Sequence, residues 1–148
     1  MKTTNSLRIL SQFFMIAVLL SGCSNDTFTY CFRQDSNNVE KIEICSYDHN
    51  SGTRTPIIKL EKGAENALME ELSALECHQF FPLDPILSYG DKVIYITYYD
   101  GEVEMIGEYN IGWITPSGKL NTTNYYFDLQ EIRDLIEKYA FLQNDENT

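Results

Sequence analysis

The chain has 148 residues, of which 43% are hydrophobic, and its formal net charge is −11. The apolar content is ample for a packed core, which excludes a disordered tail. The acidic excess argues against nucleic-acid binding, because phosphates must be neutralised by lysine and arginine. It fits either plain solubility or a basic protein partner, and composition leaves both alternatives open.

The first 23 residues combine a basic start, a short apolar run and a cysteine. Lys2 and Arg8 precede an apolar run of about 12 residues. This run is too short for a membrane-spanning helix, which needs roughly 20 residues. The run leads into Leu-Ser-Gly-Cys at residues 20–23. This ending resembles the lipobox of bacterial lipoprotein precursors, in which a lipid is attached to the cysteine thiol and the chain is cut before it.

The resemblance implies a signal peptide at residues 1–22, a lipid anchor on Cys23 and a short tether at residues 23–26. The protein would then be held on a bacterial membrane, in the cell envelope, with its domain outside the cytoplasm. Residues 1–22 contain two basic residues and no acidic residue, so their removal would take the net charge from −11 to −13. An ordinary secretory signal, cut after a pair of small residues, is the alternative.

Residues 27–142 are predicted to form a single α+β domain. Alternating apolar residues predict strands over 27–33, 39–47 and 53–60, with polar turns between them. A helix is expected over 64–76, because three leucines recur there at helical spacing.

Three cysteines remain for the domain. Cys31 alternates with aromatic residues and Cys45 alternates with isoleucines. Each thiol therefore lies on the face of its strand opposite to those apolar side chains. If the two strands are neighbours, both thiols lie on one side of the sheet, which favours a Cys31–Cys45 disulfide. Three cysteines nevertheless permit three pairings. Cys77 would then be free, and we expect it to be a small buried hydrophobe.

A hairpin is the clearest element of the second half, after an irregular, proline-containing stretch at 80–87. The strand over 93–99 is followed by Asp100-Gly101, a typical two-residue type I′ loop. That loop makes Ile96 face Met105 on the core side. The opposite face, on which Ile106 is an apolar exception, carries a candidate binding patch: Tyr95, Tyr99, Glu102 and Glu104. Tyrosine offers amphipathic contact area, although strand propensity also explains tyrosines here.

Two further strands, over 108–115 and 120–127, lead to a final helix. Asp128 is the expected N-cap of this helix, and residues 143–148 form a polar tail. The predicted fold is an antiparallel sheet of about six to seven strands with two helices packed on one face. The order of elements is β-β-β-α-β-β-β-β-α.

The sequence contains no strong catalytic or metal-binding motif. The two histidines, His49 and His78, are expected to be structural or solvated. No paired-cysteine zinc motif or glycine-rich phosphate loop is present, and we predict no metal and no cofactor. Paired carboxylates of a hydrolase stay open as an alternative, because acidic residues are abundant.

These features favour a lipid-anchored, non-catalytic binding or inhibitory module on the cell surface, with a basic protein as its partner. An envelope hydrolase that uses acidic residues is the second hypothesis. A structural subunit of a larger envelope complex is the third.

Overall fold

The computed structural model describes residues 27–48, 50–51, 53–79 and 88–141. The predicted signal peptide, the tether with Cys23, His49, the stretch at 80–87 and the tail at 143–148 lie outside the described residues. No helix within the described part is long and apolar enough to cross a bilayer.

The described chain is an α+β fold, as predicted. In chain order its elements are β1 (Thr27–Thr29), the 3-10 helix η1 (Ser36–Asn38), β2 (Val39–Asp48), β3 (Thr53–Lys59), α2 (Lys62–Ala74), β4 (Glu76–Gln79), β5 (Lys92–Tyr98), β6 (Val103–Gly107), β7 (Ile111–Ile114), β8 (Leu120–Thr122), β9 (Tyr125–Phe127) and α3 (Leu129–Phe141).

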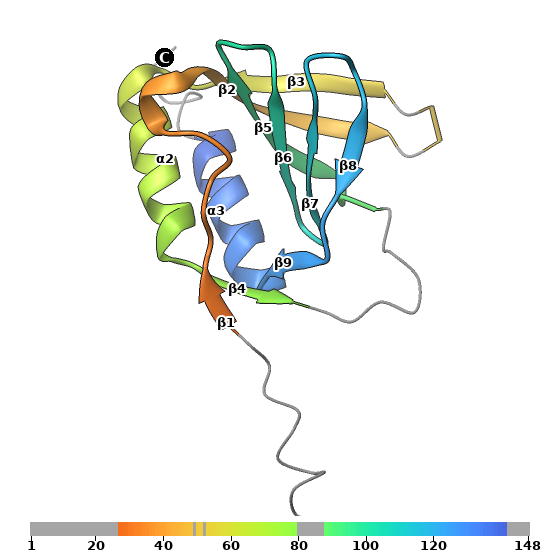
Figure 1. The fold of residues 1–148 in the computed structure, drawn as a ribbon. Helices are drawn as coiled ribbons and strands as arrows, with labels where there is room; N and C mark the ends of the chain where they lie inside the picture. The colour runs from red at the N-terminus through yellow and green to blue at the C-terminus, as the bar shows by residue number, and fades with distance from the viewer. Residues whose placement is uncertain (1–26, 49, 52, 80–87, 142–148) are drawn as a thin grey trace, which may run out of the picture.

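The strands form two antiparallel sheets, whereas the sequence predicted one. The six-stranded sheet has the order β3-β2-β5-β6-β7-β8, and the three-stranded sheet has the order β1-β4-β9. The small sheet exists because β1 pairs with β4 rather than β2, and because β8 and β9 divide the predicted strand over 120–127. Both helices cover the same face of the large sheet, as predicted (Figure 1).

The main core lies between that face and the two helices. Its central side chains are almost fully buried, and they come from β2, β5, α2 and α3: Ile42, Ile44, Ile94, Ile96, Leu68, Leu72, Ile132 and Ile136. Helix α3 begins as predicted, because the Asp128 carboxylate accepts hydrogen bonds from the backbone N–H groups of Gln130 (2.9 Å) and Glu131 (3.2 Å).

The loop of the β5–β6 hairpin differs from the predicted type I′ turn. The N–H of Gly101 donates to the carbonyl of Tyr98 (2.9 Å), and the N–H of Tyr98 donates to the carbonyl of Glu102 (2.9 Å). The loop therefore has three residues, and Gly101 adopts φ of +86° where the chain re-enters the strand.

The longer loop shifts the register of β6 by one residue. Ile96 lies opposite Glu104 and not opposite Met105. Because strand side chains alternate, the shift moves every β6 side chain to the other face. Ile106 joins the main core, which removes the apolar exception in the predicted pattern, and Glu104 becomes buried on the same side.

The opposite face of the large sheet carries a second, smaller apolar cluster that includes Cys45, Tyr95 and Met105. Tyr89 in this cluster lies against the glycines of β6 and β7. A Cβ atom on Gly112 would be 2.3 Å from the Tyr89 hydroxyl, so only glycine allows the ring to lie there.

Candidate functional site

Glu104 is a fully buried carboxylate that is hydrogen-bonded on both oxygens. Its Oε1 accepts a hydrogen bond from the hydroxyl of Tyr30. Its Oε2 accepts one from the hydroxyl of Tyr98 (2.5 Å) and one from the backbone N–H of Arg33 (3.2 Å). Two of these three donors belong to the irregular chain that follows β1, so a residue of β6 holds the N-terminal part of the domain.

Burial shifts the pKa values of this buried network upward. The loss of solvent raises the pKa of the Glu104 carboxyl, and the hydrogen bonds from the two tyrosines and Arg33 oppose this rise only in part. Burial and the nearby Glu104 carboxylate also raise the pKa of the Tyr30 and Tyr98 hydroxyls, which therefore keep their protons and act as donors.

The guanidinium of Arg33 makes the next attachment. Its Nε atom lies 2.6 Å from Oε1 of Glu102, and its Nη2 atom lies 3.3 Å from Oε2. The hydrogen bond to Glu102 raises the pKa of Arg33. The same guanidinium lies over the ring of Trp113, 4.2 Å from its centroid.

Residues 30–34, which we call the clamped segment, have no helical or strand structure. The Gln34 amide adds a last attachment, a hydrogen bond of 2.8 Å to Asp100. The segment runs from β1 to η1 across the sheet face, on the side of the helices (Figure 1). Its position is therefore set by these contacts with the β5–β6 hairpin and β7, together with the packing of Tyr30 and Phe32 on the main core.

These contacts correct the predicted binding patch. Glu102 and Glu104 bind the chain's own clamped segment and do not form an open patch with the two tyrosines. Tyr95 is 2% exposed on the far face of the sheet, where the Arg54 guanidinium lies 4.7 Å from its ring centroid. Tyr99 is 71% exposed in the hairpin loop. The register shift separates the four residues.

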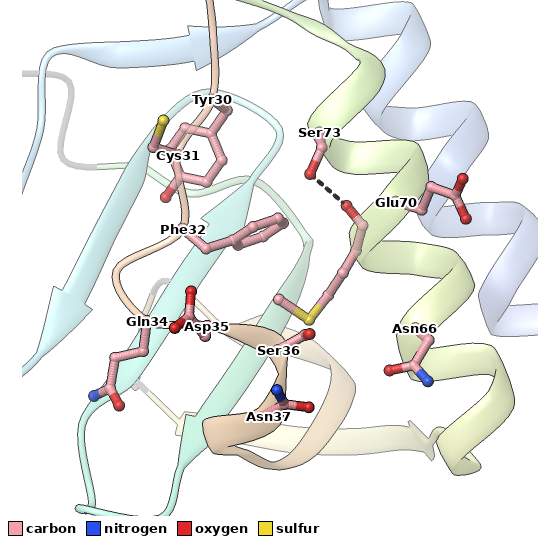
Figure 2. A pocket seen from close by; sticks show the side chains of 11 residues that line it. Tyr30, Cys31, Phe32, Gln34, Asp35, Ser36, Asn37, Asn66, Glu70 and Ser73 are labelled. Carbon is pink, nitrogen blue, oxygen red and sulfur yellow. Dashed lines mark hydrogen bonds between the residues drawn. The ribbon is translucent and has the colours of Figure 1, made fainter.

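A hollow of about 570 Å³ lies between the clamped segment, η1 and helix α2, and we call it the polar groove. Figure 2 shows its two walls, with Phe32 pointing from the segment toward the helix. Its volume is within the range of ligand-binding sites. The residues that line it are Tyr30, Cys31, Phe32, Gln34, Asp35, Ser36, Asn37, Asn66, Met69, Glu70 and Ser73.

The polar side chains of this groove are largely unused within the protein. Asp35, Asn37, Asn66 and Glu70 make no side-chain hydrogen bond or ion pair with other described residues. No lysine, arginine or histidine of the described chain lines the groove. It therefore offers two carboxylates and two amides to a ligand, without a cation of its own.

A second hollow of about 330 Å³ lies on the other side of the clamped segment, against β7 and the β8–β9 connection. Glu104 and Trp113 are among its lining residues, and Tyr30 and Cys31 line both hollows. Because Glu104 is fully buried and engaged on both oxygens, this hollow lacks an available carboxylate at that position.

The predicted Cys31–Cys45 disulfide is wrong in this structure, where both thiols are free. Cys31 follows the end of β1 and is exposed, whereas Cys45 is buried on the far face of the large sheet. The prediction required β1 to lie beside β2, and β1 pairs with β4 instead. Cys77 is a free, fully buried thiol in the main core, as predicted.

Cys77 and His78 are both engaged within the fold, and the described residues contain no metal cluster. Burial raises the pKa of Cys77 to about 11, which keeps its thiol protonated and unreactive. His78 stacks on Tyr126, with 5.4 Å between ring centroids. No group of three or more His, Cys, Asp or Glu in the described part is placed to hold a metal ion.

Comparison with known proteins gives no relative: no family model, curated protein or solved structure matches the chain.

Proposed function

We propose that the protein is a lipid-anchored, non-catalytic binding module of the bacterial cell envelope, and that the polar groove binds a basic partner protein. Cys23 would carry the lipid, and the domain would lie outside the cytoplasm. The anchor follows from the lipobox-like residues 20–23 and the short apolar run before them.

The observation that carries the binding proposal is how the clamped segment is held. A buried carboxylate contributes little net stability to the position of an irregular chain, because its desolvation free energy offsets much of what its hydrogen bonds contribute. Glu104 nevertheless fixes one wall of the polar groove, through Tyr30 and the backbone of Arg33. A wall fixed before binding reduces the entropy cost of binding, which is an advantage for a recognition site.

The same geometry favours binding over acid-based hydrolysis. A hydrolase of that kind needs a carboxyl group that is free to donate or accept a proton at the substrate. Glu104 and Glu65 are the buried carboxylates of the described residues. The oxygens of Glu104 are occupied by Tyr30, Tyr98 and Arg33, and those of Glu65 by the backbone N–H of Ile42 and the ammonium of Lys62. Asp35 and Glu70, which line the groove, are exposed.

The tether also orients the domain in this proposal. Three residues, 24–26, separate Cys23 from β1. The four Cα–Cα steps from Cys23 to Thr27 span roughly 13 Å at full extension, so the end of the domain at β1 would stay close to the headgroups. The chain then leads through the clamped segment to η1, which lies at the other end of the domain from β1 in Figure 1.

Two measurements on the full chain test this proposal. Mass spectrometry of the N-terminal peptide should find acyl chains on Cys23, and Cys23→Ala should carry none. The anchored wild type should also retain a basic envelope protein that is released by salt, because exposed charge pairs are screened. An unmodified Cys23, or a membrane fraction that retains no partner at low salt, would contradict the proposal.

A further inference from the structure

We infer that the polar groove binds an extended peptide segment that carries a lysine or arginine side chain. This inference rests on the proposed function and specifies the ligand of the same site. It follows from three properties of the groove: the charge of its two walls, its apolar floor and its pair of amides.

The two walls carry like charges that the protein leaves uncompensated. Asp35 stands on the chain between the clamped segment and η1, and Glu70 stands on α2 (Figure 2). Neither carboxylate forms an ion pair with a described residue. A cationic side chain in the groove would interact favourably with both walls, whereas an anionic ligand would be repelled by both.

Between the carboxylates, the groove has apolar surface that fits the stem of a long basic side chain. Phe32 projects from the segment toward α2 (Figure 2). Met69 of α2 also lines the groove and is 5% exposed. The methylenes of lysine or arginine pack well on such surfaces while their charged ends stay at the polar rim. Phe32 and Met69 therefore favour these side chains over a small inorganic cation.

The amides of Asn37 and Asn66 suit the backbone of the ligand. They belong to η1 and α2 and lie near the same end of the groove (Figure 2). Each side-chain amide offers a donor and an acceptor, as a peptide bond does, and neither has a partner among the described residues. An extended peptide leaves its backbone groups available for such contacts.

The test uses the mature protein and a fluorescent peptide of alternating lysine and threonine, about ten residues long. Matched peptides carry glutamine or glutamate in place of lysine. The inference predicts saturable binding of the lysine peptide, at least tenfold weaker binding of the glutamine peptide and no binding of the glutamate peptide. The difference follows from the loss of attraction to the two exposed carboxylates, each of which accounts for up to about a fivefold change in affinity.

A charge-matched pair of variants separates the groove from the general acidity of the domain. The variant D35N/E70Q removes two carboxylates from the groove, and E76Q/E131Q removes two exposed carboxylates from β4 and α3. We expect about tenfold weaker binding of the lysine peptide to the first variant and less than a twofold change for the second. An equal loss in both variants would overturn the inference, because it would show nonspecific attraction.

Two further outcomes are informative. Binding of a neutral oligosaccharide such as maltopentaose, unchanged in D35N/E70Q, would overturn the peptide assignment in favour of a glycan. Failure of the lysine peptide while the anchored protein still retains a salt-released partner would overturn the ligand class and leave the proposed function standing. Circular dichroism of each variant confirms that the exposed substitutions leave the fold intact.

Discussion

The hydroxyl of Tyr30 donates a buried hydrogen bond to the carboxylate of Glu104, across 74 residues of sequence. This contact joins the chain that leaves β1 to the middle of the large sheet. The hydroxyl of Tyr98 and the backbone N–H of Arg33 donate the other hydrogen bonds that this carboxylate accepts. Stability, pH dependence and the shape of the polar groove should therefore all respond to changes at these positions.

Glu104→Gln should change the pH dependence of stability. Because burial raises the pKa of Glu104, the folded protein takes up the proton more readily than the unfolded chain. The contribution of this carboxyl to stability is then complete below its unfolded pKa and is lost as pH rises through the folded value. In urea unfolding, the wild type should lose stability relative to Glu104→Gln as the pH rises above the ordinary pKa of a glutamate. A constant or growing advantage of the wild type would contradict the assignment.

Tyr30→Phe removes one donor and leaves Glu104 buried. An unsatisfied buried group costs about 1–3 kcal/mol, so the free energy of unfolding should fall by that amount. Denaturant midpoints measure the change. Tyr99→Phe is the control, since this tyrosine is exposed in the hairpin loop and should change stability by less than about 0.5 kcal/mol. Similar losses in both variants would argue against a stabilising hydrogen bond between Tyr30 and Glu104.

Arg33→Ala should loosen the clamped segment without unfolding the domain. The substitution removes the contacts with Glu102 and Trp113, which together contribute about 1 kcal/mol in a partly exposed setting. Hydrogen exchange of residues 30–34 should become faster, while exchange of β5 stays slow. Arg54→Ala is a matched control, because Arg54 lies on a tyrosine ring on the other face of the sheet. Unchanged exchange in Arg33→Ala would show that other contacts hold the segment.

The glycine at position 112 should be sensitive to a single methyl group. Gly112→Ala would place Cβ 2.3 Å from the Tyr89 hydroxyl and 2.6 Å from the Asn121 carbonyl. We expect a loss of about 1–3 kcal/mol on thermal unfolding. Tyr89→Phe should be neutral or slightly stabilising, because the buried Tyr89 hydroxyl has no hydrogen-bond partner within the described part of the chain. A tolerated Gly112→Ala would contradict the packing described here.

The thiols should differ in reactivity in the native state. Cys31 is exposed, whereas Cys45 and Cys77 are buried and burial raises the pKa of both thiols. A maleimide should modify Cys31 quickly and the other two only after unfolding. Recovery of a Cys31–Cys45 disulfide from the purified native protein would contradict the structure.

Local signals in the sequence were sufficient for part of this fold. The N-cap at Asp128 lies directly before an apolar helical stripe, so the start of α3 could be located from the residues alone. The faces of β2 were also predictable, because Ile42 and Ile44 alternate with Cys45 across the strand.

Features that depend on loop geometry or distant pairing could not be predicted from the sequence. Asp100-Gly101 fits a two-residue loop as well as a three-residue one, and that single residue decides whether Glu104 faces solvent or the core. The pairing of β1 with β4 leaves no local pattern. For both reasons the sequence does not reveal the clamped segment, although it points to Glu102 and Glu104 themselves.

If the polar groove is the binding site of an anchored module, filling it should abolish binding. The most direct measurement compares partner retention by three forms of the full chain: wild type, Asn66→Trp and Tyr99→Trp. The indole at position 66 would fill the groove, whereas the one at position 99 would extend from the hairpin loop. We predict that the wild type and Tyr99→Trp retain the partner and that Asn66→Trp loses it. Equal retention by all three forms would contradict the claim.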